Sequence, residues 1–337
     1  MTREMLARAL EEGKAPTVAV FGDFCLDRYV YIDASRDEPS LETGLTAWQI
    51  THERCQPGAA GTITNNLRAL GANVLCIGIL GQDGAGYELK KALNRVGAST
   101  EFMVETGERC TCCYLKPMRC EGGKETEQNR HDYKNFTPTP RSVEDALLGQ
   151  LRRALPQCDA VLVCDQYLEP DCAAVTAYVR TELAQMAEEF PNVVFYVDSR
   201  GFIDQFDKMM IKCNHNEIAH IFGVSPDTVD VEAAGHYASK LSERTGRPVV
   251  VTLGERGNVV WDGTEATHVP AFPVTGEIDV VGAGDACNAG LVFALCKGLP
   301  LKDAALVGNA ASHLVIQQIG TTGTATLAAV EAVLKTK

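Results

Sequence analysis

The sequence predicts an α/β fold: a three-layer sandwich in which helices cover a mostly parallel central sheet, with a small antiparallel β flap. Short apolar runs of strand length alternate with segments of helical spacing, and glycines follow many of them. Two long stretches, about 28–55 and 106–136, break the alternation with strand-like pieces that have no helix between them. We therefore expect one domain over residues 1–337, with these two stretches forming a lid.

In the first half of the chain, the predicted elements follow one another as strand, helix, strand and helix. Residues 17–21 form a short β-rich run, 62–70 have helical spacing, and 74–80 form an apolar run of strand length. A second helix is predicted over 86–96. The last three of these elements end at Gly71, Gly81 and Gly97.

The same alternation continues after the second long stretch. Strands are predicted over 160–164, 193–197, 210–213 and 249–253. Helices are predicted over 173–189, 233–245, 285–295, 304–316 and 327–334. Since parallel strands need long crossover connections, this order favours a parallel sheet.

The two long stretches contain four strand-like pieces, 29–32, 45–51, 110–116 and 126–133. We interpret them as a small antiparallel sheet. Long excursions in α/β enzymes often close over a ligand. The alternative is a pair of decorated loops without a catalytic role.

Composition and charge narrow the classes of partner. Hydrophobic residues make up 45% of the 337 and charged residues 22%, as in globular proteins. The 31 basic and 44 acidic residues give a net charge of −13, which repels nucleic acid phosphates and anionic lipid headgroups. No run approaches the roughly 20 apolar residues of a membrane helix, and residues 1–12 lack the apolar core of a secretory signal. We therefore expect a cytoplasmic protein that binds neither nucleic acid nor membrane.

Thirteen cysteines are an unusual feature of the chain. Four cluster at Cys110, Cys112, Cys113 and Cys120, but without the paired C-x-x-C spacing of zinc sites. Metal binding there is the minor alternative. An odd total without a secretory signal favours reduced thiols.

A glycine turn near the C-terminus carries the clearest chemistry, D-V-V-G-A-G-D-A-C-N-A-G at 279–290. Glycines allow close approach of a ligand, and the first helical turn that follows offers unpaired N–H groups. We expect the N–H groups of Ala283, Gly284 and Asp285 to bind phosphoryl oxygens while the Asp285 carboxylate takes a proton from a hydroxyl nucleophile. The alternative is an ordinary glycine turn with Asp285 as helix cap.

Residues 279–292 resemble the second signature of the ribokinase (PfkB) family of carbohydrate kinases, D-[T/V]-x-G-A-G-D-x-x-x-A-G. The resemblance implies a ribokinase-like fold and transfer of the γ-phosphoryl of ATP to a hydroxyl of a sugar or sugar phosphate. It implies Asp285 as general base and the amides of Gly282, Ala283 and Gly284 as anion hole. It also implies a monovalent cation, K⁺, near Asp279 and Val281.

Two further motifs resemble the nucleotide side of that family. Asn214 and Glu217 match its N-x-x-E motif, which implies that Glu217 helps to hold Mg²⁺, through water, beside the triphosphate. The alternative is a capping-box pair at a helix start. The T-L-G-E-R-G turn at 252–257 is similar to a turn along the nucleotide phosphates, which assigns Thr252, Gly254 and Gly257 to ATP. The resemblance also gives Asn309 an adenine contact and Arg200 a role in neutralising phosphate charge.

The N-terminal half is expected to hold the acceptor. Asp23 and Asp27 follow the first strand, and carboxylates at the carboxyl end of a parallel strand point into the ligand crevice. The pattern G-D-x-x-x-D-R-Y resembles the heptose-phosphate kinase branch of the family. That branch implies acceptor contacts from Arg130, with Lys116 or Arg119 as further cations. The alternative is an ordinary charged strand edge.

One motif departs from the family. Its first signature, G-G-x-x-N, is replaced by Gly58, Ala59 and, at the position of the asparagine, Thr62. We expect Gly58, Thr62 and Asn66 to line the acceptor site, but the departure leaves the sugar open. The same departure is consistent with a second hypothesis for the function, a sugar or nucleotide sensor that has the fold but no catalytic activity. The resemblance also implies a homodimer formed through the lid, because an exposed flap edge often pairs in this family.

Overall fold

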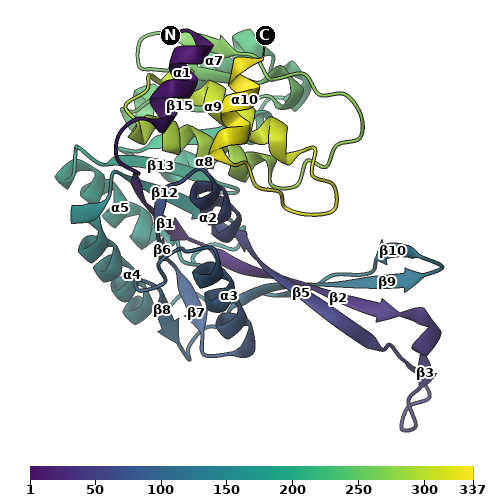
Figure 1. Ribbon diagram of the computed structural model, residues 1–337. Helices are drawn as coiled ribbons and strands as arrows, with labels where there is room; N and C mark the ends of the chain where they lie inside the picture. The colour runs from purple at the N-terminus through teal and green to yellow at the C-terminus, as the bar shows by residue number, and fades with distance from the viewer. Residues whose placement is uncertain (337) are drawn as a thin grey trace.

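A computed structural model describes residues 1–336. Its central sheet has the strand order β17–β16–β15–β14–β13–β12–β1–β6 (Figure 1). The strands are β1 (Thr17–Gly22), β6 (Asn73–Ile77), β12 (Ala160–Asp165), β13 (Val194–Ser199), β14 (Met210–Asn214), β15 (Val249–Thr252), β16 (Asn258–Trp261) and β17 (Ala266–Val269). Six of these strands run parallel, namely β6, β1, β12, β13, β14 and β15. Strands β16 and β17 add an antiparallel hairpin at the β15 edge. The predicted mostly parallel sheet is confirmed.

Helices pack on both faces of this sheet. One layer holds α1 (Arg3–Glu11), α2 (Ala60–Ala69), α3 (Gly84–Arg95), α8 (Ala283–Cys296), α9 (Leu301–Val315) and α10 (Leu327–Lys335). The other holds α4 (Arg141–Ala154), α5 (Ala177–Glu189), α6 (His215–Phe222) and α7 (Val231–Thr245). In β1, Val18 and Val20 belong to the first core and Ala19 and Phe21 to the second, because successive side chains point to opposite faces. The predicted three-layer sandwich is therefore confirmed.

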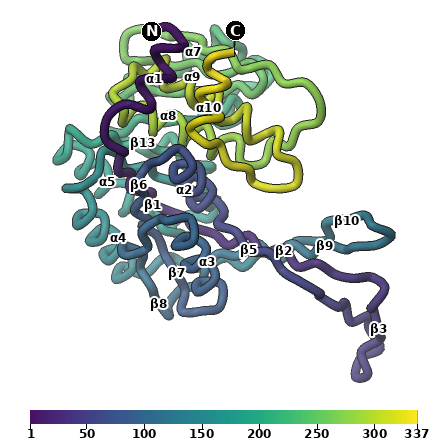
Figure 2. The backbone as a smooth tube through the Cα atoms, viewed as in Figure 1, coloured from purple at the N-terminus to yellow at the C-terminus, as the bar shows by residue number. Residues whose placement is uncertain are grey.

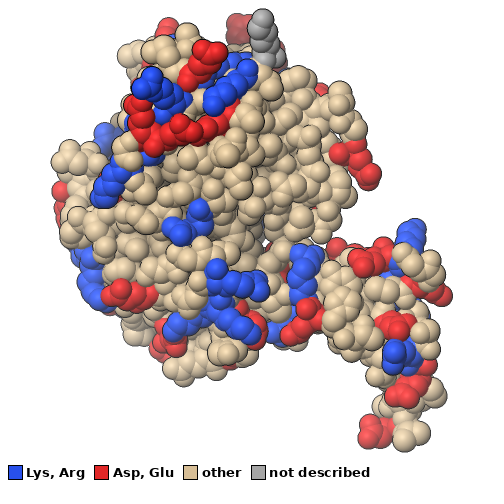
Figure 3. Space-filling view, in the orientation of Figure 1, with Lys and Arg blue, Asp and Glu red and all other residues tan. Residues whose placement is uncertain are grey.

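A second sheet, which we call the lid sheet, projects from this body (Figures 1 and 2). It consists of β2 (Phe24–Asp33), β5 (Ile50–Ala59), β9 (Cys112–Glu121), β10 (Lys124–Glu127) and β11 (His131–Tyr133). The short strands β3 (Glu38–Pro39) and β4 (Thr46–Ala47) form a hairpin between β2 and β5. Side chains of both charges lie along this projection (Figure 3).

The lid sheet is mixed rather than purely antiparallel. Strand β2 pairs antiparallel with β5, and β9 pairs antiparallel with β10 and β11, as expected. However, β2 and β9 run parallel over nine residue pairs. Each is the outgoing strand of its own excursion, so both leave the body in the same direction.

Three local predictions differ from the structure. The predicted strand 74–80 is two strands, β6 and β7 (Ile79–Gly81), and β7 pairs with β8 (Val104–Thr106) instead of joining the central sheet. Helix α5 begins at Ala177 rather than 173, because the Thr176 side chain accepts a hydrogen bond from Val179 N and caps it. Helix α4 and the β16–β17 hairpin were not predicted.

Three findings bear on the predicted class. No helix within residues 1–336 is long and apolar enough to cross a membrane. All thirteen cysteines are free thiols. Within the same residues, no group of three or more His, Cys, Asp or Glu side chains is arranged to hold a metal ion, so the cysteine cluster does not form a metal site there.

Candidate active site

A pocket of about 230 Å³ opens where the central sheet meets the start of α8. Its lining comes from the carboxyl ends of β12, β13 and β14, from the first turn of α6 and from the glycine turn. The residues are Gln166, Asp198, Arg200, Lys212, Asn214, Glu217, Gly282, Gly284 and Asp285. Carboxyl ends of parallel strands lie at one edge of a sheet, where α/β proteins bind ligands.

The start of α8 exposes backbone donors to this pocket. Gly282 caps the helix in the left-handed conformation, with φ 81°, and no side chain caps it. Among the described residues, no group accepts a hydrogen bond from the N–H of Gly284 or Asp285, whereas Ala283 N donates to Val280 O at 3.2 Å. Two of the three predicted amides are therefore free to bind an anion, aided by the helix dipole.

The carboxylate of Asp285 lies at this helix start, partly exposed to the pocket that it lines. Surrounding protein and the Asp198 carboxylate raise the pKa of Asp285 from 3.8 to about 7, against the opposing effect of Lys212 and Arg200. A general base is most effective when its pKa lies near the working pH.

Lys212 lies beneath the glycine turn and is only 5% exposed. Its Nζ is 3.0 Å from Asp198 Oδ2, on the neighbouring strand. Asn288 Nδ2 donates to the same Asp198 oxygen at 2.6 Å, and Tyr196 Oη donates to Asn288 Oδ1 at 2.9 Å. Burial alone would lower the pKa of Lys212, but the Asp198 carboxylate outweighs it and raises that pKa, so the ammonium stays protonated.

Asn214 and Glu217 form a capping box at the start of α6. Asn214 Oδ1 accepts from Glu217 N at 2.9 Å, and Glu217 Oε2 accepts from Asn214 N at 2.7 Å. Both residues also line the pocket, and the hydrogen bonds of the described residues use only one Glu217 oxygen. A single carboxylate is enough for Mg²⁺, which keeps most of its waters and binds substrate phosphates. The site therefore fits the ion, and the cap and the ligand role are compatible.

The residues expected to hold the acceptor lie on the lid sheet. Asp27 Oδ1 lies 3.2 Å from Lys116 Nζ, which also donates to Tyr29 Oη at 3.1 Å. A Cβ on Gly58 would lie 2.8 Å from Asp27 Oδ2, so a larger residue at position 58 would displace this carboxylate. The charge of Asp27 is a minor cause of the raised pKa of Asp285.

A further link joins the lid sheet to the body. Gln56 Nε2 donates to Thr322 Oγ1 at 2.6 Å, and Arg54 Nη1 donates to Gln56 Oε1 at 2.6 Å. The Arg54 guanidinium stacks on the Tyr29 ring, 4.0 Å from its centroid. Thr322 lies 3.7 Å from the place where a Cβ on Gly282 would stand, so this link reaches the glycine turn.

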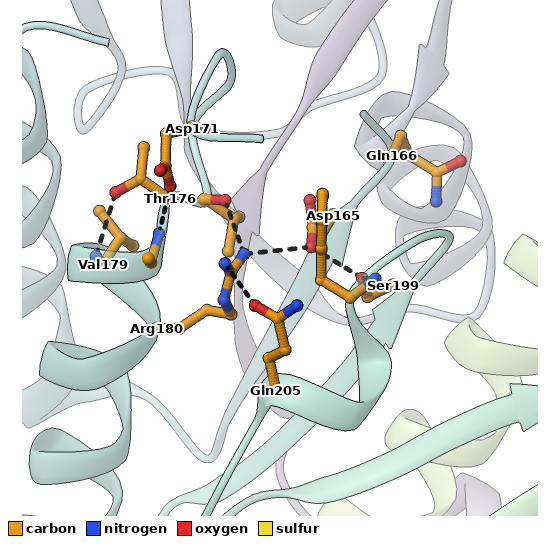
Figure 4. A network of polar contacts seen from close by, with 12 residues as sticks. Asp165, Gln166, Asp171, Thr176, Val179, Arg180, Ser199 and Gln205 are labelled. Atoms are coloured by element: carbon orange, nitrogen blue, oxygen red, sulfur yellow. Dashed lines mark hydrogen bonds and ion pairs between the residues drawn. The ribbon is translucent and has the colours of Figure 1, made fainter. Parts of the chain in front are cut away.

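A buried polar network supports the pocket from behind (Figure 4). Asp165 Oδ2 accepts from Ser199 Oγ at 2.7 Å and lies 3.9 Å from Arg180 Nη1, which comes from α5. Burial and the nearby Asp23 carboxylate raise the pKa of Asp165 to about 8. The next residue, Gln166, turns away from this network and lines the pocket. The network thereby fixes the ends of β12 and β13.

Comparison with known proteins decides the family. Residues 16–327 match the family described as pfkB family carbohydrate kinase. The bifunctional protein HldE of Azorhizobium caulinodans is 31% identical over 319 residues, which cover 93% of this chain and 63% of that protein. This chain belongs to the pfkB family of carbohydrate kinases. HldE of Wolinella succinogenes is 29% identical over 92% of this chain and 63% of its own length, so the chain spans less than two thirds of these relatives.

Solved structures of a ribokinase and a phosphofructokinase share the fold. Arabidopsis thaliana ribokinase, solved with ribose and ATP, superposes with a TM-score of 0.71 at 17% identity, over 96% of this chain and all of that one. Escherichia coli phosphofructokinase-2, solved with potassium, gives a TM-score of 0.72 at 16% identity, over 95% and 98% of the two chains. The predicted ribokinase-like fold is confirmed.

Six of the predicted site residues line the pocket, namely Gly282, Gly284, Asp285, Asn214, Glu217 and Arg200. Asp27 lies on the lid sheet, outside that lining. The roles of all these residues stay predictions.

Three other predicted residues use their polar groups inside the protein. Asp23 accepts from Gln166 N and Ala174 N, while burial raises its pKa to about 6. Asn66 is fully buried and bonds to Thr62 O, Gly323 O and Ala325 N. Asn309 donates to Val269 O and Pro270 O, which fixes the chain after β17. Each has a structural task whether or not it also contacts a ligand.

The remaining predicted residues lie around the pocket. Thr62 reaches the glycine turn, with Cγ2 3.7 Å from the place of a Gly282 Cβ. Gly257 has φ 87°, and a Cβ there would collide with Val269 O, so the turn at 252–257 requires glycine. Arg130 is paired with Asp132 at 2.6 Å on an exposed part of the lid sheet. Val281 N donates to Asp279 Oδ1 at 3.0 Å beside the glycine turn.

Sequence reasoning missed four residues of the site, namely Lys212, Gln166, Arg54 and Gln56. Lys212 carried a signal that was overlooked. It is a charged residue in an apolar strand that directly precedes the Asn214 motif. A lysine in a buried strand is rare unless it is paired.

Proposed function

We propose that this chain transfers the γ-phosphoryl group of ATP to a hydroxyl of a sugar or sugar phosphate. The observation that carries the proposal is that Asp285 stands at an uncapped helix start, in one pocket with Lys212, Arg200 and Glu217. A carboxylate among anion-binding groups is useful when a proton must leave a nucleophile that attacks a phosphoryl group.

In the proposed reaction, Asp285 takes the proton of the acceptor hydroxyl as the new O–P bond forms and the bond to the ADP oxygen breaks. The free N–H groups of Gly284 and Asp285 bind the oxygens of the transferred group. They are fixed before the reaction, because the helix holds them in place, so they cost no reorganisation.

Residues at the β14 side of this site would hold Mg²⁺ and ATP. Glu217 would hold the hydrated ion through Oε1, the carboxylate oxygen that the capping box does not use. Asn214 lies beside it. The ion would neutralise charge on the phosphates. Thr252, Gly254, Gly257 and Asn309 are proposed to line the rest of the nucleotide path.

The acceptor would lie between Asp27 and Asp285. Asp27 would accept hydrogen bonds from sugar hydroxyls, and Lys116 lies 3.2 Å from it as a compensating charge in a buried place. Arg54 and Arg130 place guanidinium groups on the lid sheet, although Arg130 is paired with Asp132 on an exposed part of it. A phosphorylated acceptor would suit them, because guanidinium groups bind phosphate bidentately.

A monovalent cation is proposed near the glycine turn. Asp279 Oδ1 and Oδ2 accept from Val281 N and Gly320 N, and so join the two loops at this point. The proposal draws support from the related phosphofructokinase-2, which was solved with potassium. Activity in potassium buffer should exceed activity in tetramethylammonium buffer.

The lid sheet is proposed to cover the acceptor and to pair with a second copy of the chain. Its far end exposes large apolar side chains, Leu41, Leu45, Trp48 and Ile50. Such a group is unusual on a monomer, and it lies far from the core. Trp48→Glu should weaken the dimer in analytical ultracentrifugation if this end forms the contact.

The proposal is tested by screening sugars and sugar phosphates for ADP release and for thermal stabilisation. A kinase should release ADP with at least one acceptor, and Mg²⁺ removal by EDTA should stop it. Thermal stabilisation by a sugar, without ADP release at any ATP concentration, would instead support the idle sensor.

A further inference from the structure

Two thiols that the proposed reaction does not use lie side by side at the start of the lid sheet. Cys25 on β2 is the register partner of Cys112 on β9, and the two strands run parallel. Register partners point to the same face of a sheet, and neighbouring strands lie about 4.8 Å apart. This spacing falls within the roughly 4.4–6.8 Å between Cα atoms that a disulfide spans. The pair is therefore placed to form one, although both thiols are free in this structure.

The two thiols differ in their surroundings. Cys25 is fully buried, and its hydrogen bond to Cys112, together with burial, raises its pKa. The same Cys25 thiol lowers the pKa of Cys112 by hydrogen bonding, and the hydroxyls of Tyr167 and Tyr114 add to this effect. Burial and the Asp23 charge oppose it. Because the thiolate is the reactive form of cysteine, Cys112 is the better nucleophile and Cys25 remains protonated beside it.

Cys112 also lines a small cavity that shares no lining residue with the pocket of the candidate active site. The cavity has a volume of about 20 Å³ and is partly open to solvent. The exposed Cys110 and the buried Tyr167 and Cys172 line it as well. A volume of this size holds about one water-sized molecule. It therefore suits hydrogen peroxide and excludes a bulky oxidant such as oxidised glutathione.

We propose that hydrogen peroxide oxidises Cys112 and that Cys25 then closes a disulfide between β2 and β9. The Cys112 sulfur attacks one peroxide oxygen, the O–O bond breaks, and hydroxide leaves to take up the Cys112 proton, which gives a sulfenic acid and water. The Cys25 sulfur then attacks the Cys112 sulfur, the S–O bond breaks, and a second water leaves with the Cys25 proton. Two thiols are thus oxidised to one disulfide while one peroxide is reduced to two waters. The modification does not depend on the proposed phosphoryl transfer.

Two other thiols of this region compete with the proposed pair. Cys172 packs in the same apolar cluster as Cys25 and Cys112, and Cys110 is the exposed thiol of the cavity. Burial raises the pKa of Cys110, and its Sγ donates to Asn135 Oδ1 at 3.4 Å. The proposal therefore expects a nearly buried thiol to react before an exposed one.

The test treats the reduced, full-length chain with hydrogen peroxide at pH 7 and stops the reaction in denaturant with N-ethylmaleimide. Peptide mass spectrometry without reduction then follows each cysteine over time. Cys112 should disappear about tenfold faster than Cys110, and the main disulfide should join Cys25 to Cys112. In Cys25→Ser the Cys112 peptide should gain oxygen instead, because the resolving thiol is missing. The control Cys172→Ala should form the Cys25–Cys112 disulfide as fast as wild type.

The wild-type measurement alone decides the proposal, so a variant that fails to fold does not weaken the test. Faster loss of Cys110 than of Cys112, or a main disulfide between Cys112 and Cys172, would overturn it. Equally fast oxidation of Cys112 by oxidised glutathione would also contradict it, because that molecule is too large for the cavity.

Discussion

Lys116 Nζ and Asp27 Oδ1, on the parallel strands β9 and β2, lie 3.2 Å apart in the lid sheet. Both side chains are nearly buried, so neither charge is well solvated. A buried carboxylate that loses its cation is left uncompensated. The pair therefore joins two strands of the lid sheet at the place proposed for the acceptor.

Replacing Lys116 should affect the acceptor and not the nucleotide. In Lys116→Met, kcat/KM for the acceptor should fall about 10–100-fold, the effect of losing a hydrogen bond to a charged group. KM for ATP should stay within about twofold. Lys124→Met, at the exposed β9–β10 turn, is the matched control. Equal changes in both KM values would place the ion pair outside the acceptor site.

The pH dependence of activity should report on Asp285. Its pKa is raised from 3.8 to about 7 by burial and by Asp198, and a general base must be ionised to accept a proton. We expect kcat/KM for the acceptor to fall as the pH drops below about 7, which a rate profile from pH 5 to 9 would show. A profile that stays flat down to pH 5 would contradict this assignment.

The pH dependence of stability should report on Asp165. The folded protein holds its pKa at about 8, above the unfolded value, so the protonated form favours folding. This contribution is full below about pH 4 and is lost as the pH rises to about 8. Asp165→Asn should flatten the fall in unfolding free energy over that window, as measured by urea denaturation. Some dependence of the unfolding free energy on pH should remain in this variant, because the pKa values of Asp23 and Asp285 are raised too. The exposed Asp227→Asn should leave the wild-type slope unchanged, and an equally unchanged slope in Asp165→Asn would refute the prediction.

The departure at Ala59 should carry a stability cost. Ala59 precedes α2 with φ 52° and ψ −118°, a conformation that favours glycine. Glycine would remove this backbone strain. The free energy gained exceeds the cost of the extra freedom that glycine gives the unfolded chain, so Ala59→Gly should stabilise the protein by about 1 kcal/mol. Its neighbour Ala60→Gly, within the helix and buried, should destabilise it by about 1 kcal/mol. Thermal denaturation of both variants shows whether each substitution raises or lowers the stability. Destabilisation by Ala59→Gly would mean that the backbone at this residue is unstrained.

Local patterns predicted those parts of the fold and site that depend on neighbouring residues. Apolar runs located the parallel strands, and the G-A-G-D turn located an uncapped helix start that faces the pocket. The amphipathic helix α4 lies between the second lid excursion and β12 and was not predicted, although the regular spacing of its apolar residues indicates a helix.

Other features depend on contacts that no local pattern contains. Lys212 faces Asp198 only because β13 and β14 pair in one register. Asn66 looked like a ligand residue, but the segment after Gly323 covers its amide. The parallel pairing of β2 with β9 joins segments about 90 residues apart in sequence.

The central claim is that Asp285 removes a proton while the turn before it holds a phosphoryl group. The most direct test measures kcat and ATP affinity for Asp285→Asn, with the acceptor found in the screen. We expect kcat to fall about 10²–10⁴-fold with ATP affinity nearly unchanged, because the amide cannot accept the proton. A variant that keeps kcat within a few-fold of wild type would contradict the account.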